Sequence, residues 1–191
     1  MTTQWGPPLL FWDIETTDLE ADRGRLLCFG ATASDGDLFW STLPTAGRAA
    51  TRRSLRFTFD VLRSHPYWVT FNGRRFDVPF LFGMGAKFGM LPPTPRLHLD
   101  LYAWVRRQLR FSCRRLVYLS HHLLADDPYV GPWAGQPGGL ASFSQAAKRG
   151  EPCIKCVRDL RATHNLTLLF LRKLHRRFPS LRRLRCPTRA I

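Results

Sequence analysis

Two carboxylates interrupt an apolar run near the start of the chain, and they constrain the fold more than any other feature. Asp13 and Glu15 belong to the stretch LLFWDIET at residues 9–16, where aromatic and branched side chains surround them. Such a run predicts a strand buried on both faces. Burying ionised carboxylates is costly unless a positive partner compensates. Because alternate side chains of a strand share a face, Asp13 and Glu15 together suit a divalent cation.

The charge of the whole chain indicates a polyanionic partner. Lys and Arg number 29 against 14 Asp and Glu, which gives a net charge of +15. A field of this sign favours nucleic acid. Hydrophobic residues make up 45% of the 191 residues, enough for a packed core. We expect a single domain over residues 1–178, followed by a basic tail at 179–191.

The sequence also indicates where in the cell the protein is expected. It contains no apolar run of about 18 residues, and its first residues, MTTQWGPP, do not have the pattern of a signal peptide. A cytoplasmic protein without membrane contact is expected. Five cysteines without regular spacing suit a reducing compartment. Cys153 and Cys156 form a C-x-x-C, which we interpret as core thiols, with redox or metal binding as the alternatives.

Periodicity along the remainder predicts a mixed α/β protein. Two strands joined by a tight turn follow the first strand, and strands and helices then alternate. The region 126–139 is rich in Pro and Gly and is expected to be a loop that lines a site. The last helix carries an apolar stripe of Val157, Leu160, Leu168 and Leu171. The predicted strands are 25–34, 37–41, 67–71 and 97–101, and the predicted helices are 49–64, 76–87, 102–110, 114–124 and 151–177.

Three more acids have hydrophobic neighbours. Asp77 follows a predicted strand in VTFNGRRFDVPFL, Asp100 ends the strand LHLDL, and Asp159 lies inside the last helix. Acids in such settings usually pair with Arg or Lys or bind a metal. Asp77 could instead cap the helix that begins beside it, and Asp159 could be a solvated acid on a helix face. For Asp100 a structural role is the preferred interpretation.

These motifs and their order resemble those of the DEDD, or DnaQ-like, 3′–5′ exonucleases. The similarity is greatest to the ribonuclease-H-like branch that includes the exonuclease domains of family B DNA polymerases, and it spans residues 8–175. The resemblance implies a ribonuclease-H-like mixed β-sheet flanked by α-helices. It also implies that Asp13, Glu15, Asp77 and Asp159 hold two divalent ions, Mg²⁺ or Mn²⁺, for phosphodiester hydrolysis.

The same resemblance implies contacts to substrate. Asn72 matches the second-motif residue that touches the terminal nucleotide, and Thr16, Thr17 and Leu19 match the turn that packs against the 3′-terminal sugar and base. Arg74 and Arg75 flank the second motif. Further phosphate contacts are expected from a larger basic set, and base stacking from exposed aromatic residues. The basic set is Arg106, Arg107, Arg110, Arg114, Arg115, Arg172, Lys173, Arg176, Arg177, Arg182, Arg183 and Arg185, and the aromatic candidates are Trp12, Phe71, Phe76, Trp104 and, best placed, Trp133.

The chain departs from the family at one catalytic position. The family places a tyrosine four residues, or a histidine five residues, before the last aspartate, whereas this chain has Lys155 and Ile154 there. Lys155 lies at i, i+4 from Asp159 and shares its helix face. It then acts as a base, holds the scissile phosphate, or forms an ordinary ion pair with Asp159. His164 should point away from that face, and His98, His121 and His122 have no position assigned by sequence.

The sequence therefore predicts a metal-dependent 3′–5′ exonuclease acting on single-stranded DNA or RNA ends and releasing nucleoside 5′-monophosphates, with a polymerase or a repair or processing factor as a further partner. Two alternatives stay open. One is a catalytically weak or inactive nucleic-acid-binding module, which Lys155 favours. The other is a structure-specific endonuclease that uses the same metal site.

Overall fold

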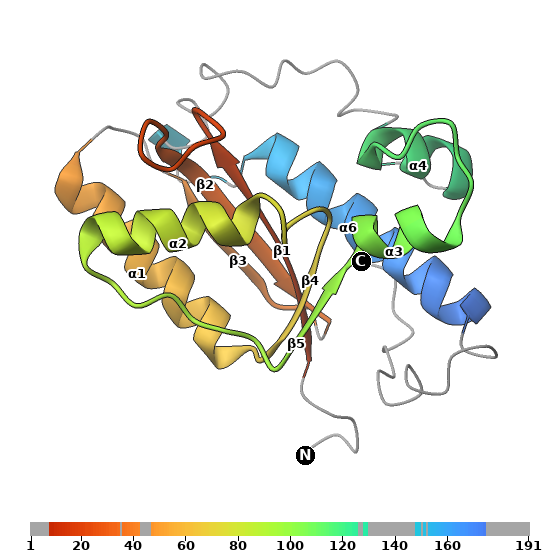
Figure 1. The fold of residues 1–191 in the computed structure, drawn as a ribbon, viewed down its shortest axis with the longest axis horizontal. Coiled ribbons are helices and arrows are strands. Elements are labelled where there is room, and N and C mark those ends of the chain that lie inside the picture. Colours follow the sequence, from red (N-terminus) through yellow and green to blue (C-terminus); the bar gives the residue numbers. More distant parts are fainter. Residues whose placement is uncertain are drawn as a thin grey trace.

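The computed structural model describes residues 8–34, 36–42, 47–125, 128–129, 148–149, 151 and 153–174, with side chains up to residue 170. A five-stranded sheet forms its centre, in the order β3-β2-β1-β4-β5 (Figure 1). β1 pairs antiparallel with β2 and parallel with β4, β2 pairs antiparallel with β3, and β4 pairs parallel with β5. The strands are β1 Leu9–Thr16, β2 Leu26–Ala33, β3 Leu38–Thr42, β4 Tyr67–Thr70 and β5 Leu97–Asp100.

Helices flank this sheet, and with it they form the expected ribonuclease-H-like fold. They are α1 Arg48–Ser64, α2 Asp77–Phe88, α3 Leu101–Gln108, α4 Leu116–Leu123 and α6 Ile154–Leu174. The expected α/β class and element order are confirmed, with most ends within one or two residues of their predicted positions. The expected tail at 179–191, Trp133 and the basic residues beyond 175 lie outside the described residues. No helix in the described part of the chain is long and apolar enough to span a bilayer.

The alternation of side chains along β1 sends its residues into two different layers. Leu10, Trp12 and Ile14 pack with the buried faces of α1 and α2. Leu9 and Phe11 face the other way and pack against Leu160 of α6. Because side chains two apart share a face, Asp13 and Glu15 continue the α6 side of the strand. The local period of two therefore directs both carboxylates toward the last helix.

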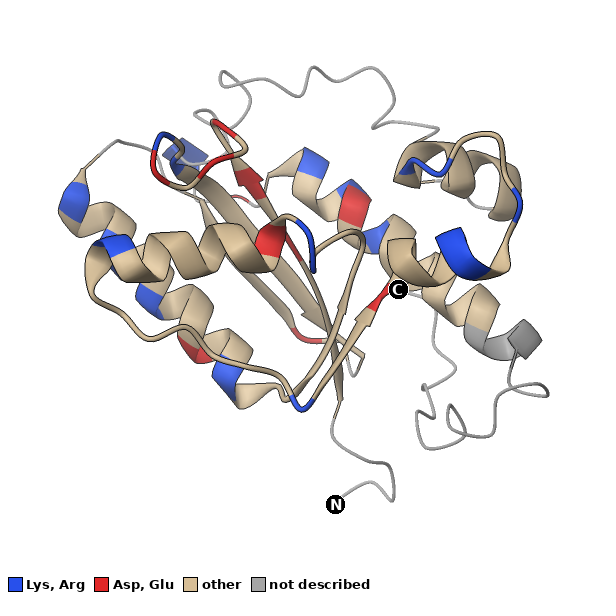
Figure 2. Cartoon of the chain, viewed as in Figure 1, with Lys and Arg blue, Asp and Glu red and all other residues tan. Residues whose placement is uncertain are grey.

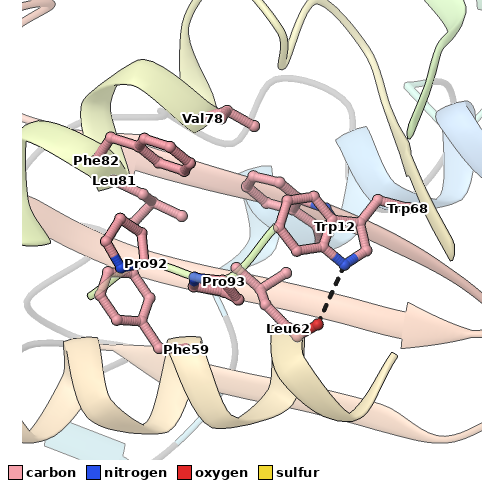
Figure 3. Close-up of a pocket in the computed structure, with 9 residues that line it drawn as sticks. All are labelled: Trp12, Phe59, Leu62, Trp68, Val78, Leu81, Phe82, Pro92 and Pro93. Atoms are coloured by element: carbon pink, nitrogen blue, oxygen red, sulfur yellow. Dashed lines mark hydrogen bonds between the residues drawn. The ribbon is translucent and has the colours of Figure 1, made fainter. Parts of the chain in front are cut away.

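The α1 and α2 side of the sheet is an apolar layer. A shallow hollow there is lined by side chains of β1, α1, β4, α2 and the segment that follows α2 (Figure 3). Trp12 meets Trp68 edge to face at 5.4 Å, and the Trp68 Nε1–H donates to the carbonyl oxygens of Leu62 and His65, at 3.2 and 2.7 Å. Since Trp12 and Asp13 are adjacent on a strand, this hollow lies on the opposite face from the acids.

Helix α6 buries a different stripe from the one predicted. Val157 and Leu168 are only half-buried, and the side chain of Leu171 is not described. Leu160 is buried as predicted, and the other buried residues that follow the helical repeat are Cys156, Thr163, Thr167 and Phe170. The prediction counted only large aliphatic residues, whereas the buried face of α6 also contains a cysteine and two threonines. The Thr167 hydroxyl is satisfied by donating to the Thr163 carbonyl at 2.7 Å, so its burial is tolerated.

Glycine permits the close approach of α6 to β2. A Cβ atom at Gly30 would lie 2.7 Å from the Sγ of Cys156 and 3.0 Å from a methyl group of Leu160. A contact of 2.7 Å does not occur in packed proteins, so a larger residue at position 30 would force the Cys156 side chain or the helix to shift. Cys28, Cys153 and Cys156 form a small buried cluster at the same junction, which agrees with their interpretation as core thiols.

Candidate metal centre

Three carboxylates converge between β1 and α6. Oxygen atoms of Asp13, Glu15 and Asp159 all lie within 4.8 Å of one another, although Asp159 is far from the other two in sequence. All three residues are half-buried. Figure 2 shows the acidic positions of β1 beside the acidic position of α6. The predicted association of the first-strand acids with the acid of the last helix is therefore present in the structure.

Burial and the crowding of like charges raise the pKa of Asp13. Burial raises its pKa well above the ordinary value, and the charges of Asp77, Asp159 and Glu15 raise it further. Burial also raises the pKa of Glu15, against the opposing effect of Lys155. Carboxylates that repel one another in this way bind a cation strongly, because the cation removes the repulsion.

Asp77 stands at the edge of this group. It is almost fully buried at the first turn of α2, and its Oδ1 accepts a hydrogen bond from the Ile14 backbone N–H at 3.2 Å. It does not belong to the set of oxygens within 4.8 Å. Burial raises its pKa to about 7. The hydrogen bond ties α2 to the centre of β1, so Asp77 approaches Asp13 from a second element.

Lys155 is held inside the cluster. Its ammonium group donates to Glu15 Oε1 and lies 3.7 Å from Asp159 Oδ2. Burial disfavours the charged lysine, but Glu15 and Asp159 outweigh that effect and hold its pKa above the ordinary value. The ion pair between Lys155 and Asp159, one of the alternatives that the sequence left open, is present, and the contact with Glu15 adds to it. The expectation that Lys155 loses its proton easily assumed bound metal, and in the metal-free protein the acids shift its pKa in the opposite direction.

Sequence reasoning missed Tyr129. Its hydroxyl donates to Asp159 Oδ1 at 2.5 Å, and the guanidinium of Arg158 lies 5.8 Å from the centre of its ring. Tyr129 belongs to the Pro/Gly-rich region 126–139, which was expected to line a site. That expectation was the only indication in the sequence that a residue of this region could reach the acids. Nothing in the sequence indicated which residue of that region would reach Asp159, because their contact depends on the path of the intervening chain.

The predicted substrate-binding residues lie in two connections of the sheet. Thr17, Leu19, Arg74 and Arg75 are exposed, and Leu19 is 73% exposed. Thr16 is half-buried, and its hydroxyl donates to the Asp18 carbonyl at 2.7 Å. These four exposed residues present surface to a ligand, whereas Thr16 helps to shape the turn after β1.

Asn72 has the left-handed backbone conformation, with φ of 66°, which asparagine tolerates better than most residues. Asp100 holds this connection in place. Its carboxylate accepts hydrogen bonds from the backbone N–H groups of Asn72 and Arg74, each at 3.0 Å, and from Tyr102 and Ala103 at the start of α3. The structural role preferred for Asp100 agrees with these contacts.

The remaining candidates are structural as well. His98 hydrogen bonds to Thr70 at 2.8 Å, and burial lowers its pKa to about 4. His164 packs against Phe11 in the core, with ring centroids 4.7 Å apart. Among the aromatic candidates, Trp12 is buried, and Phe71, Phe76 and Trp104 are half-buried against core clusters. Bases could not stack on Trp12 without unfolding the sheet.

This sheet order and the acids at its centre define a nuclease-type domain of the ribonuclease-H-like class. The family model for the RNase H superfamily matches residues 10–126, more than half of the chain, and the protein therefore belongs to that superfamily. Sequence comparison with curated proteins finds no match.

Among solved structures, the chain is similar to the family B DNA polymerase of the hyperthermophilic archaeon Pyrobaculum calidifontis. The TM-score is 0.62 and the identity is 17%. The match covers 88% of this chain but only 24% of the polymerase. This similarity concerns the fold, and the chain corresponds to about a quarter of the polymerase's length.

Proposed function

We propose that this protein is a metal-dependent 3′–5′ exonuclease that shortens single-stranded nucleic acid and releases nucleoside 5′-monophosphates. One observation carries the proposal: carboxylates from β1 and α6 bring their oxygens within 4.8 Å of one another inside an RNase H superfamily fold. Burial and the neighbouring acids raise the pKa of Asp13 and so disfavour its charged form. A bound cation would offset this unfavourable setting.

The donor set fits a hard divalent cation. Carboxylate oxygens are the ligands that Mg²⁺ and Mn²⁺ prefer, and Asp13, Glu15 and Asp159 would hold such ions with Asp77 beside them. A bound ion would supply positive charge that stabilises the attacked phosphate and favours ionisation of the attacking water. The resemblance to the DEDD exonucleases supports the 3′–5′ direction, since the turn with exposed Leu19 matches their contact with the terminal nucleotide.

The protein's own residues position the substrate. Arg74 and Arg75 are exposed immediately before α2, where their charges can neutralise phosphates of the strand that enters the site, and the Arg74 guanidinium is anchored by donating to the His98 carbonyl oxygen. Asn72 lies at the start of the same connection and is fixed by Asp100. A preorganised loop of this kind reduces the entropy lost when a flexible single strand binds.

The first prediction concerns activity. Single-stranded DNA and RNA labelled at the 5′ end, incubated with Mn²⁺ or Mg²⁺, should give a ladder of products shortened from the 3′ end. Asp13→Ala should lower the rate by about 100-fold or more, because it removes several kcal/mol of transition-state stabilisation. The control is Asp60→Ala, an exposed acid of α1 across the sheet, which should leave the rate unchanged.

Two other results would favour one of the alternative functions over the exonuclease. Cleavage of a circular single strand would identify an endonuclease. Binding of both polymers without a ladder from either would overturn the enzymatic proposal and identify a nucleic-acid-binding module, the function that the contact of Lys155 with Glu15 favours.

A further inference from the structure

The ammonium group of Lys155 occupies a cation position within the acidic cluster. It contacts Glu15 Oε1, lies 3.7 Å from Asp159 Oδ2, and so reaches two of the three clustered carboxylates. The partners are shielded from solvent, with side chains 12% exposed for Glu15 and 19% for Asp159. A positive charge bound to two carboxylates makes the same contacts that a shared metal ion would make.

Lys155 lies in a part of α6 that packs tightly against β1. Its neighbour Cys156 is buried, and the Cys156 thiol lies 3.7 Å from the carbonyl oxygen of Asp13. Leu160, one turn further along α6, packs against Phe11 of β1. These contacts fix the helix against the strand in the turn that follows Lys155. The core therefore positions the helix turn that carries Lys155, and two ion pairs hold its side chain, which is 42% exposed, against the acids.

The charges of the cluster agree with a single added divalent ion. The three carboxylates whose oxygens lie within 4.8 Å of one another carry three negative charges when ionised, which one ammonium and one divalent cation balance; Asp77 lies outside this set. A second divalent ion beside the same ammonium would leave the three carboxylates with excess positive charge, and like charges at such separations repel strongly in a half-buried site.

We propose that Lys155 permanently fills one of the two cation positions and that the site of the native protein takes a single divalent metal ion. The inference rests on the proposed function, since it presupposes that the acids bind metal. During hydrolysis the ammonium would supply to the scissile phosphate the positive charge that a second ion supplies in a two-ion site.

The test counts bound metal in the full-length protein. We expect titration with Mn²⁺, followed by isothermal calorimetry and by electron paramagnetic resonance of the free ion, to give one ion per chain. Lys155→Met, which keeps the length of the side chain without its charge, should bind two. It should also bind the first ion at least about tenfold more tightly, because a nearby positive charge is removed.

Three further variants keep the test interpretable. Lys148→Met removes the same charge from an exposed position of the chain and should still bind one ion. Lys155→Arg keeps the charge and should also bind one. Lys155→Gln is a second neutral replacement in case Lys155→Met fails to fold, and it should bind two ions.

The outcomes separate this inference from the proposed function. Two ions in the native protein, or one ion in a folded neutral Lys155 variant, would overturn the inference and leave the exonuclease proposal standing. A native protein that binds no Mn²⁺ at millimolar concentration would overturn both, whether or not the neutral variants bind it.

Discussion

Asp100 and Asp13 are both carboxylates of the central sheet, but the structure surrounds them differently. Asp100 accepts hydrogen bonds from four backbone N–H groups, two before α2 and two at the start of α3. Asp13 faces Asp77, Asp159 and Glu15, which raise its pKa beyond the effect of burial. The first carboxylate is satisfied by the backbone and stabilises the fold, whereas the second is kept in a repulsive setting that a cation relieves.

At the residue scale, Asp100→Ala should lower the free energy of unfolding by about 2–4 kcal/mol. The change removes a helix cap and leaves two further N–H groups without their acceptor. Urea denaturation in EDTA measures it. The matched control is Asp60→Ala, whose exposed ion pair with Arg63 should contribute no more than about 0.5 kcal/mol. Equal losses from the two variants would contradict the structural role of Asp100.

At the element scale, the separation of α6 from β2 controls the acidic cluster. Helix α6 carries Lys155 and Asp159, and its contact with the sheet depends on the absence of a side chain at Gly30. Any outward movement of the helix would separate Asp159 from Asp13 and Glu15. The geometry of the candidate metal centre is thus set by a packing contact outside it.

Gly30→Ala should destabilise the protein by about 1–3 kcal/mol, since the new methyl group would overlap the Cys156 sulfur. In a Cys156→Ala background the same change should cost less, about 1 kcal/mol, because the closest atom is gone and only the tight contact with the Leu160 methyl group remains. Thermal or urea unfolding of the native protein, the two single variants and the double variant gives the coupling free energy between the two substitutions.

Gly47→Ala, where a Cβ would meet open space, serves as the control and should cost under about 1 kcal/mol. Additive effects of Gly30→Ala and Cys156→Ala would show that the close contact does not limit the helix position.

At the scale of the whole molecule, charge is distributed around the sheet. Basic positions lie on α1, α3 and α6 and in the connection before α2 (Figure 2). Arg106, Arg107, Arg110 and Arg115 are exposed around α3 and α4. The net charge of +15 attracts any polyanion, so it produces affinity without selecting a site. Arginines near the acidic cluster should differ from the others by contacting phosphates directly.

The salt dependence of binding measures those contacts. For single-stranded nucleic acid, the double variant Arg74→Ala/Arg75→Ala should reduce the slope of log K against log salt concentration by up to about 1.4, or about 0.7 for each lost phosphate contact. Arg52→Ala/Arg53→Ala makes the same charge change on exposed positions of α1, which lies across the sheet from the acidic cluster, and should alter the slope little. Fluorescence anisotropy provides the measurement. Identical slopes for the two double variants would place the nucleic acid elsewhere.

Local patterns in the sequence determined the elements and the direction of the first carboxylates. The period of two along residues 9–16 was enough to place Asp13 and Glu15 on one face, because strand geometry depends only on neighbouring residues. Helical spacing likewise located the last helix and put Lys155 and Asp159 on one side of it. The motif order then indicated the RNase H-like class.

Tertiary structure alone decided which groups these carboxylates meet. The hydrogen bond of Tyr129 to Asp159, the ammonium of Lys155 on Glu15, the backbone donors of Asp100 and the contact of Asp77 with the Ile14 N–H all join segments distant in sequence. Such contacts depend on how closely helices pack on the sheet, to within about an ångström. No local period encodes that distance, because it results from the volumes of many side chains packed together.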